Sequence, residues 1–397
     1  MSALPQNLLI QRWPSMFGVL GAGLYRRRKM KVLQGKKSGR CCQETMDLAS
    51  AVNSFSQRHG VSHRRPTLPQ LDVKFNVIPE TLESPFKEHF PVFSKGLVQG
   101  EPGGFVFHPH YARNADKIYN MKIRPDDVWI RTFPRSGTTW TSELAWLIVN
   151  DCNFEEAARV PLTVRAPNTD ANYFADWSEF APPEIMENLI TIEKIEQMPS
   201  PRVVKSHLPF HLLPPNLLDT AKVIYVARNP KDAIVSFFYF HKLVKLCHFT
   251  GDMEDFVDYF INNKLNWTPY FPTVLEAWAK RDHPNLLYLF YEDMKKDLPT
   301  EIRKIAAFLN KTLTEEQVAK LVDHVVVDKF AKNESVNMAR EVSAGLTNEG
   351  YSFVRKGETG DWKNHFSPEV NRKIDEWIEK NLAGTDLKFV TELEDSK

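Results

Sequence analysis

The chain has 397 residues, of which 42% are hydrophobic and 25% charged, and its formal net charge is +1. These values are typical of a soluble globular protein with a sizeable core, and the near-neutral charge excludes a broad basic surface for nucleic acid. No apolar run approaches the roughly 20 residues that span a membrane, so we expect neither nucleic acid nor a membrane as a partner. The four cysteines show no CxxC or metal-ligand spacing, which favours free thiols in a reducing compartment.

The first part of the chain differs in composition from the rest. Residues 1–43 carry nine Lys or Arg and no Asp or Glu, and a stretch rich in Ser, Gln, His and Arg follows. We predict a basic, disordered N-terminal extension over residues 1–70 and a single globular domain over residues 71–397. An Arg-rich, acid-free start also fits a mitochondrial targeting segment or sequence absent from the mature protein. The favoured interpretation is a dispensable tail on a cytoplasmic protein.

Apolar runs typical of buried strands alternate with helical patterns along the globular part. Strands are expected at 127–133, 202–207, 222–228 and 286–291, and helices at 138–150, 229–240, 298–310, 314–324 and from 367 onward. Asn229 before Pro230 predicts a helix N-cap followed by proline at the first helical position, and Thr314 with Gln317 fits a capping box. The alternation predicts an α/β fold, a three-layer sandwich around a central parallel β-sheet. Ligands of such sheets bind beyond the carboxyl ends of the strands.

The segment TFPRSGTTW, residues 132–140, lies at such a strand end. A turn of small and hydroxyl residues between a strand and a helix directs backbone N–H groups and the positive helix end at an anion. Ser136, Thr138 and Thr139 add hydroxyl donors, and Arg135 adds a guanidinium that can hold a phosphate or sulfate. Taken alone, the segment fits an ordinary capped turn equally well. It lacks the second glycine and the lysine of a nucleoside triphosphatase loop, which argues against kinase chemistry.

Three further segments place cations or a histidine at or near strand ends. Lys205 and His207 lie two residues apart, so their side chains share one face of an extended chain, and a histidine can take a proton from a hydroxyl group. Arg228 ends the next strand, and Ser236 lies two turns into the following helix, which suits a second phosphate. RKGETGDW, residues 355–362, adds adjacent cations and two glycines. Each segment alone also fits a solvated charge cluster or a loop histidine, but together they describe a crevice with two anion sites and one base.

The set and order of these motifs resemble those of the cytosolic sulfotransferases, which transfer a sulfuryl group from 3′-phosphoadenosine 5′-phosphosulfate (PAPS) to small acceptors. The resemblance runs from about Gly104 to Asn381 and rests on FPRSGTTW, KSHLP, YVARNPKDAIVSFFYF, FYEDMKKD and RKGETGDWKNHF. The stretch RPDDVWIRTFPRSGTTWTSELAWL looks closest to arthropod members. The resemblance implies a P-loop-like strand–loop–helix that binds phosphosulfate, PAPS as co-substrate and no metal. It also implies in-line transfer to a hydroxyl or amine of a small hydrophobic acceptor.

The resemblance implies a role for each matching residue. The 5′-phosphosulfate would be held by the turn, through Arg135, Ser136, Gly137, Thr138 and Thr139, with Trp140 stacking near the adenine. The 3′-phosphate would be held by Arg228, Ser236, Arg355, Lys356 and Gly357. Tyr291 would approach the adenine. His207 would be the general base and Lys205 would neutralise charge on the transferring group, with Arg135 and Ser236 completing the catalytic set.

Three features depart from the family's pattern. Arg135 stands where the family usually has lysine; it keeps the charge and can grip two oxygens, but it cannot readily donate a proton to the departing phosphate. A Thr-Ser-Phe stretch that contacts the nucleotide falls here on three valines, residues 325–327. The family's dimer motif is degenerate, with Ser367, Pro368 and Arg372 at its positions, so the sequence leaves the oligomeric state open.

Aromatic side chains near the motifs predict an apolar acceptor pocket, although we expect many of them to be ordinary core residues. They are Phe133, Tyr173, Phe174, Trp177, Phe237, Phe238, Phe240 and Phe249. As a group they favour a hydrophobic alcohol, phenol or amine over a sugar polymer. Two alternatives remain. A non-catalytic PAPS- or PAP-binding protein on the same fold would suit the valines and the arginine, whereas an ATP-dependent kinase would need an acidic Mg²⁺ ligand and a lysine-bearing loop, neither of which is evident.

Overall fold

The structure is a computed structural model that describes residues 70–177, 186 and 189–391. The predicted basic extension over residues 1–70 therefore lies, but for its last residue, outside the described part. All described residues belong to one unit of the chain, Leu68–Lys397.

Four parallel strands form the central sheet in the order β5-β4-β6-β7. They are β4 Val128–Thr132, β5 Val203–Ser206, β6 Lys222–Ala227 and β7 Leu286–Phe290. Val128 pairs with both Val203 and Lys222, so the first three strands start level and their carboxyl ends meet at one edge. Because β5 and β6 lie on opposite sides of β4, the chain changes direction there, and a crevice opens beyond the end of β4.

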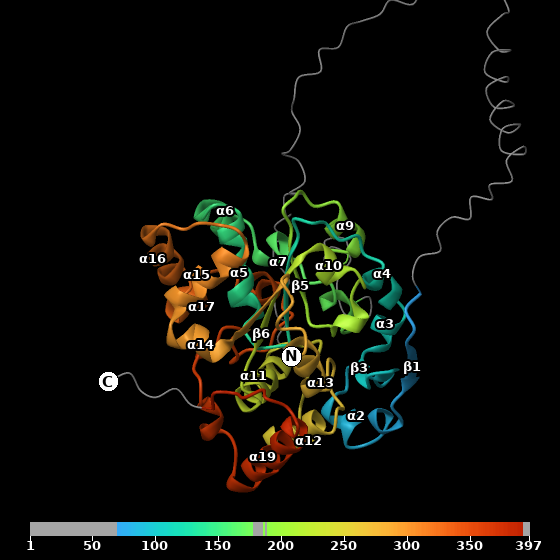
Figure 1. Ribbon diagram of the computed structural model, residues 1–397. Helices are drawn as coiled ribbons and strands as arrows, with labels where there is room; N and C mark the ends of the chain where they lie inside the picture. Colours follow the sequence, from blue (N-terminus) through green and yellow to red (C-terminus); the bar gives the residue numbers. More distant parts are fainter. Residues whose placement is uncertain (1–69, 178–185, 187–188, 392–397) are drawn as a thin grey trace, which may run out of the picture. The chain divides into compact units, whose positions relative to one another are not determined.

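Helices cover both faces of this sheet, as the three-layer prediction requires (Figure 1). The first face carries α5 Thr138–Val149, α14 Tyr291–Lys296, α15 Leu298–Phe308 and α16 Glu315–His324, and the second carries α11 Pro230–Leu243, α12 Met253–Ile261, α13 Tyr270–Trp278 and α19 Pro368–Leu382. Ile130 and Ile224 pack toward the first group, whereas Trp129 and Tyr225 pack toward the second. Successive side chains of a strand point to opposite faces, so strands buried on both faces read as unbroken apolar runs.

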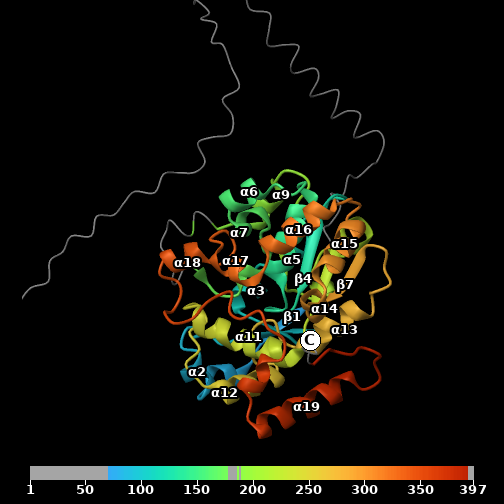
Figure 2. The same cartoon turned by 90° about the vertical axis from the view of Figure 1, so that its left-hand side faces the viewer.

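Short helices fill the connections between these layers. They are α2 Phe86–His89, α3 Pro109–Ala112, α4 Ala115–Tyr119, α6 Phe154–Arg159, α7 Leu162–Arg165, α9 Ile192–Glu196, α10 Leu217–Thr220, α17 Val327–Lys332 and α18 Ala339–Ser343, with 3₁₀ turns η1 Pro79–Leu82, η2 Ala171–Tyr173, η4 Phe210–Leu212 and η5 Asp361–Asn364. The last helix, α19, lies beside α12 in both views (Figures 1 and 2). It returns the chain to the second face of the sheet.

The helix starts agree with the capping signals in the sequence. Asn229 Oδ1 accepts from the backbone N–H of Lys231 at 2.9 Å, directly before α11. Thr314 and Gln317 form the predicted capping box at α16, with N···O distances of 3.2 and 2.9 Å. Such caps satisfy N–H groups that have no partner inside the helix, and these predictions are confirmed.

A small antiparallel sheet precedes the central one and was not predicted. It has the order β1-β2-β3, with β1 Lys74–Val77, β2 Val98–Glu101 and β3 Phe105–Phe107. Its strands are only three or four residues long, too short to show a clear alternation of apolar and polar residues. Pairing between distant segments, rather than local preference, makes them strands.

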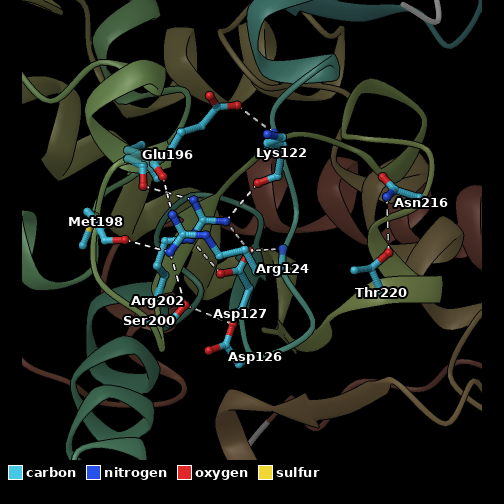
Figure 3. Close-up of polar contacts among 11 residues, drawn as sticks. Lys122, Arg124, Asp126, Asp127, Glu196, Met198, Ser200, Arg202, Asn216 and Thr220 are labelled. Carbon is cyan, nitrogen blue, oxygen red and sulfur yellow. Dashed lines mark hydrogen bonds and ion pairs between the residues drawn. The ribbon is translucent and has the colours of Figure 1, made fainter. Parts of the chain in front are cut away.

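A buried ion pair lies where two neighbouring strands begin, at the amino edge of the sheet; Figure 3 shows its polar contacts. Asp127 directly precedes β4 and Arg202 directly precedes β5, and Arg202 Nε donates to Asp127 Oδ1 at 2.7 Å. Both side chains are fully buried. Arg202 also donates to the carbonyl oxygens of Ile195 and Lys122 at 3.1 and 2.9 Å. This cluster ties neighbouring segments together and lies away from the strand ends that carry the motifs.

Candidate active site

The motif residues meet at the carboxyl edge of the central sheet because each follows the end of a parallel strand. His207, Arg228 and Tyr291 are the first residues after β5, β6 and β7, and the hydroxyl-rich turn follows β4. They line a cavity of about 350 Å³. Its lining includes these predicted site residues: Arg135, Gly137, Thr138, Thr139, Trp140, Lys205, His207, Arg228, Ser236, Tyr291, Arg355, Lys356 and Gly357. Ser136 alone among the predicted residues lies behind the cavity wall, where it is buried.

The turn after β4 has an uncommon backbone conformation. Arg135 and Gly137 have positive φ angles of 67° and 104°. A Cβ atom on Gly137 would lie 3.1 Å from Cδ2 of Tyr291, so the backbone there approaches the ring closely. Gly137 is the N-cap of the 12-residue helix α5 and offers its first-turn N–H groups no side-chain acceptor. The Ser136 hydroxyl is buried and has no hydrogen-bond partner within the described residues. Donors left unpaired at a helix start suit an anion.

Arg135 crosses from the turn to a late segment of the chain. Its Nε donates to Ser236 Oγ at 3.2 Å, and its Nη2 donates to the carbonyl oxygen of Phe353 at 2.7 Å. The guanidinium also lies over the rings of Phe353 and Phe240, 4.5 and 5.5 Å from their centres. A lysine could not make this set of contacts, because its ammonium has neither a flat face nor a fork of donors. Arg135 therefore joins the anion-binding turn to the segment around Phe353.

Two arginines that line the cavity, Arg135 and Arg228, have no acidic partner in the described part of the chain. Arg228 donates through Nη1 to the carbonyl oxygen of Arg135 at 2.9 Å and through Nη2 to that of Glu358 at 3.1 Å. Neither Arg135 nor Arg228 pairs with a carboxylate within the part of the chain that is described. Burial, followed by the charges of Arg228 and Arg355, lowers the pKa of Arg135 to about 9. An anion bound here would relieve this repulsion and desolvation.

The late cations are partly neutralised by a single acid. Arg355 Nη1 and Lys356 Nζ lie 2.6 and 2.7 Å from the two carboxylate oxygens of Asp361. Burial alone would raise the pKa of Asp361, but the hydrogen bonds from Lys356 and Arg355 contribute to holding it well below its usual range. Gly357 follows them with a φ of 64°. Asp361, which does not line the cavity, thus holds the side chains of Arg355 and Lys356 at the cavity wall.

The imidazole of His207 is held by one ring nitrogen. Nδ1 lies 3.0 Å from the carbonyl oxygen of Thr132, so Nδ1 carries the proton in the neutral ring. Nε2 has no hydrogen-bond partner among the residues described and keeps a free lone pair. Burial lowers the pKa of His207, although the Asp170 charge and the Thr132 hydrogen bond oppose it. Burial, then the charge of Arg165, lowers the pKa of Lys205 to about 8. At a given pH, a larger fraction of His207 and of Lys205 is therefore uncharged than would be in water.

Two aromatic rings and two valines form another part of the lining. Trp140 and Tyr291 meet edge to face, with ring centres 5.5 Å apart and an angle of 62°. The guanidinium carbon of Arg228 lies 4.3 Å from the centre of the Tyr291 ring. Val325 and Val327, on which the family's Thr-Ser-Phe stretch falls, line the cavity with them. This region offers flat and apolar surfaces next to the cations, which suits a nucleobase.

Much of the remaining cavity lining is apolar. Of the eight aromatic residues predicted for an acceptor pocket, the lining contains Phe174, Trp177 and Phe240, whereas Phe133, Tyr173, Phe237, Phe238 and Phe249 are core residues. The lining also contains residues that sequence reasoning did not single out: Leu162, Val244, Trp267, Met338 and Phe353. No local signal marks them, because they come from connections far apart in the chain. The same holds for Asp170, whose carboxylate accepts from the backbone N–H of His207 at 3.0 Å.

Neither a metal cluster nor a membrane helix is found within residues 70–177 and 189–391. In this part of the chain no three or more His, Cys, Asp or Glu side chains are arranged to hold a metal ion. None of its helices has the length and apolar character to cross a bilayer.

Comparison with known proteins gives one consistent match. The family model "Sulfotransferase domain" matches residues 125–386. Sulfotransferase 1C2 of Rattus norvegicus is 35% identical over 304 residues, covering 76% of this chain and 99% of the relative. Sulfotransferase 1B1 of Canis lupus familiaris is 36% identical over 298 residues, covering 75% of this chain and 96% of the relative.

Solved structures show the same similarity in three dimensions. The complex of retinol dehydratase with retinol and PAP has a TM-score of 0.74 and 37% identity, covering 80% of this chain and 99% of the neighbour. The complex of retinol dehydratase with androsterone and the inactive cofactor PAP has a TM-score of 0.75 and 36% identity, covering 80% and 98%.

Proposed function

The chain belongs to the sulfotransferase family, and we propose that it transfers a sulfuryl group from PAPS to the hydroxyl group of a small apolar acceptor, with His207 as the general base. The observation that carries this proposal is the composition of one cavity, which is lined by two arginines without acidic partners in the described part of the chain, a histidine with a free Nε2 and an apolar wall. A sulfuryl transferase needs these three elements together.

The residues around these two arginines fit a bound PAPS. Ser136 Oγ, Arg228 Nε and Trp140 Nε1 are buried polar atoms without partners within the described residues, and buried donors normally have an acceptor. The turn residues Arg135 to Thr139 would hold the 5′-phosphosulfate. Arg228, Ser236 and the segment 355–357 would hold the 3′-phosphate, and Trp140 with Tyr291 would contact the adenine.

The chain's own groups account for the steps of the transfer. PAPS, when bound, supplies a sulfuryl group whose transfer leaves negative charge on a phosphate. His207 donates through Nδ1 to Thr132, so Nε2 can accept the acceptor's hydroxyl proton. Lys205 and Arg135 place positive charge near the reacting groups, which stabilises charge as it develops. Arg135 would act as a fixed charge rather than as an acid.

The acceptor is proposed to be a small apolar alcohol. Phe174, Trp177, Phe240 and Trp267 line the same cavity as His207, and apolar walls favour a ligand that presents one polar group. Retinol and androsterone, bound by the neighbouring structures, are therefore the first acceptors to test. A phenol and a primary amine complete the panel.

The test measures product and binding separately. Wild-type protein mixed with PAPS and each acceptor should release PAP and form a sulfated or dehydrated product, identified by mass spectrometry. His207→Ala should lose turnover by roughly 10²–10⁴-fold while PAP binding, measured by calorimetry, stays close to wild type. His211→Ala is the matched control, since His211 faces Glu276 and does not line the cavity. Near-normal turnover in His207→Ala would overturn the base assignment, and PAP binding without turnover on any acceptor would favour a non-catalytic binding protein.

Domain extent and cellular location are further proposals. We propose that residues 71–397 form a single sulfotransferase domain, supported by the shared central sheet and its two packed faces. Cytoplasmic location stays a prediction, as does the mitochondrial alternative, because residues 1–69 lie outside the described part. The degenerate dimer motif leaves the oligomeric state open.

A further inference from the structure

A buried carboxylate lies directly behind the proposed base. Asp170 is 2% exposed. Its Oδ1 accepts from Ser206 Oγ at 2.9 Å and from the backbone N–H of His207 at 3.0 Å, and its Oδ2 accepts from Trp267 Nε1 at 2.8 Å. Thr169 Oγ1 lies 3.3 Å from the same Oδ1. One carboxylate therefore connects the end of β5 to the separate loop that carries Trp267.

Main-chain hydrogen bonds fix the segment that carries this carboxylate. The backbone N–H of Lys205 donates to the carbonyl oxygen of Pro167 at 2.8 Å, and that of Thr169 donates to the carbonyl oxygen of Lys205 at 2.9 Å. Asn168 Oδ1 accepts from the backbone N–H of Asp170 at 2.9 Å. The segment runs along the free edge of β5, and its bonds set the position of Asp170 beside His207.

Trp267 lines the cavity next to His207 and is hydrogen-bonded to the same carboxylate. Its ring centre lies 5.6 Å from that of His207, at an angle of 75°, and 5.6 Å from that of Phe174. Its backbone φ is 68°, a left-handed conformation that a bulky residue adopts only when its surroundings hold it there. The indole N–H bond to Asp170 is one such restraint, and it also sets the acceptor wall.

We propose that Asp170 is a positioning residue for sulfuryl transfer, which fixes the backbone of His207 and the indole of Trp267 next to the acceptor hydroxyl and stabilises the imidazolium that forms when His207 takes the proton. The proposal rests on the proposed role of His207. Asp170 acts through His207 and Trp267 and would not itself touch the transferred group.

The charges around His207 agree with this role. Burial is the largest influence and lowers the pKa of His207, and the cations of Lys205 and Arg135 lower it further; the Asp170 carboxylate is the charge that opposes them. The Asp170 charge also raises the pKa of Tyr111, after burial, and opposes the lowering of the pKa of Arg131 by burial. Without this carboxylate, protonated His207 would lose the negative charge that offsets burial and the charges of Lys205 and Arg135.

The test separates charge from geometry in a Trp267→Phe background. In Asp170→Asn, an amide NH₂ could face the Trp267 indole N–H, donor against donor, and disturb the fold. Trp267→Phe removes that donor and keeps a ring. The double variant Asp170→Asn/Trp267→Phe, compared with Trp267→Phe alone, therefore reports mainly the loss of charge. Asp127→Asn is the matched control, because it also removes a buried carboxylate, at the opposite edge of the sheet (Figure 3).

Two readouts are measured on full-length protein. The first is the imidazole pKa of His207 by ¹⁵N NMR in the absence of PAPS, with the signal assigned from its loss in His207→Ala. Relative to Trp267→Phe, the double variant should lower this pKa by about one pH unit or more. The second is the pH profile of kcat/KM with PAPS and the best acceptor, because kcat/KM reports pKa values of the free enzyme and can be compared with the NMR value. Its acid limb should move to lower pH, and the plateau kcat should fall roughly tenfold or more, short of the ~10²–10⁴-fold loss of the base itself.

Three outcomes would overturn the proposed role of Asp170. An unchanged His207 pKa in the double variant would overturn the proposal, as would an equal shift in Asp127→Asn, which would trace the effect to general destabilisation. A shifted His207 pKa with an unmoved pH profile of kcat/KM would overturn the positioning role. Failure of the base assignment is recognised independently, by turnover in His207→Ala, and leaves the NMR result readable.

Discussion

Replacing Gly357 with alanine should damage the proposed 3′-phosphate site through two separable effects. The residue has a φ of 64°, and a Cβ atom there would lie 2.5 Å from Cγ2 of Val327. The left-handed conformation costs an alanine about 1–2 kcal/mol. The contact with Val327 is far inside van der Waals distance, and such overpacking adds about 1–3 kcal/mol. The total of about 2–5 kcal/mol would be released by displacing the segment that carries Arg355 and Lys356.

The same loop provides a matched control. Gly360 has a φ of 87°, but nothing lies within 4 Å of an added Cβ. Gly360→Ala should therefore show only the conformational cost of about 1–2 kcal/mol. In Gly357→Ala/Val327→Ala the nearest remaining contact is the Val327 Cβ, 3.6 Å away, so the steric part should disappear and the conformational part persist. A double-mutant cycle isolates this coupling.

The assay is calorimetric binding of PAP together with thermal unfolding. Gly357→Ala should weaken PAP binding more than Gly360→Ala, and Val327→Ala should restore part of the loss. The reasoning is refuted if the two glycine variants behave alike, or if the Gly357→Ala and Val327→Ala effects simply add.

Two further predictions concern Arg135 and His241. Arg135→Lys removes the hydrogen bonds to Ser236 Oγ and to the carbonyl oxygen of Phe353, together with the stacking on two rings. PAP binding should therefore weaken by about 1–2 kcal/mol, roughly five- to thirtyfold. A pronounced rise in kcat would show that the native arginine limits turnover. His241 is buried, and burial lowers its pKa to about 4, so the unfolded chain takes up a proton near pH 6.5 while the folded protein stays neutral until about pH 4. Protonation of His241 in the unfolded chain therefore leaves the free energy of unfolding unchanged above pH 6.5 and lowers it as the pH falls below that value, by up to about 3 kcal/mol. His241→Leu should therefore gain stability relative to wild type between pH 6.5 and 4 in denaturant titrations, and a constant difference would contradict the burial argument.

Parallel strands explain why much of the site could be predicted from the sequence. Apolar runs such as KVIYVA mark strands covered on both faces, and the residue after such a run lies at the sheet edge where ligands bind. That rule alone brings His207, Arg228 and Tyr291 into one cavity. The N-cap at Asn229 could also be predicted from the sequence, because a helix cap bonds to backbone groups only two or three positions away.

The remaining features depend on contacts between distant segments. The antiparallel strands β1 to β3 gain their conformation from one another, and no stretch of them is long enough to show a period. Asp170 and Trp267 lie 97 positions apart, and nothing local marks either as part of a site. Five of the eight aromatic residues considered for the acceptor pocket are core residues. The sequence shows that aromatic residues cluster near the motifs, but it does not show which of them line the cavity and which pack in the core.

Arg135 shows how these two levels combine. From the sequence, an arginine in place of a lysine looked like a clamp for an anion and a poor acid. The structure shows a second role for this arginine. Its guanidinium donates to the carbonyl oxygen of Phe353, which lies 218 positions away in the sequence and two residues before Arg355. The cation proposed for the 5′ end of the co-substrate thus also orders the segment proposed for its 3′ end. It follows that a change at Arg135 should weaken both phosphate contacts together, whereas Gly357→Ala, which leaves the turn after β4 intact, should spare the 5′ contacts.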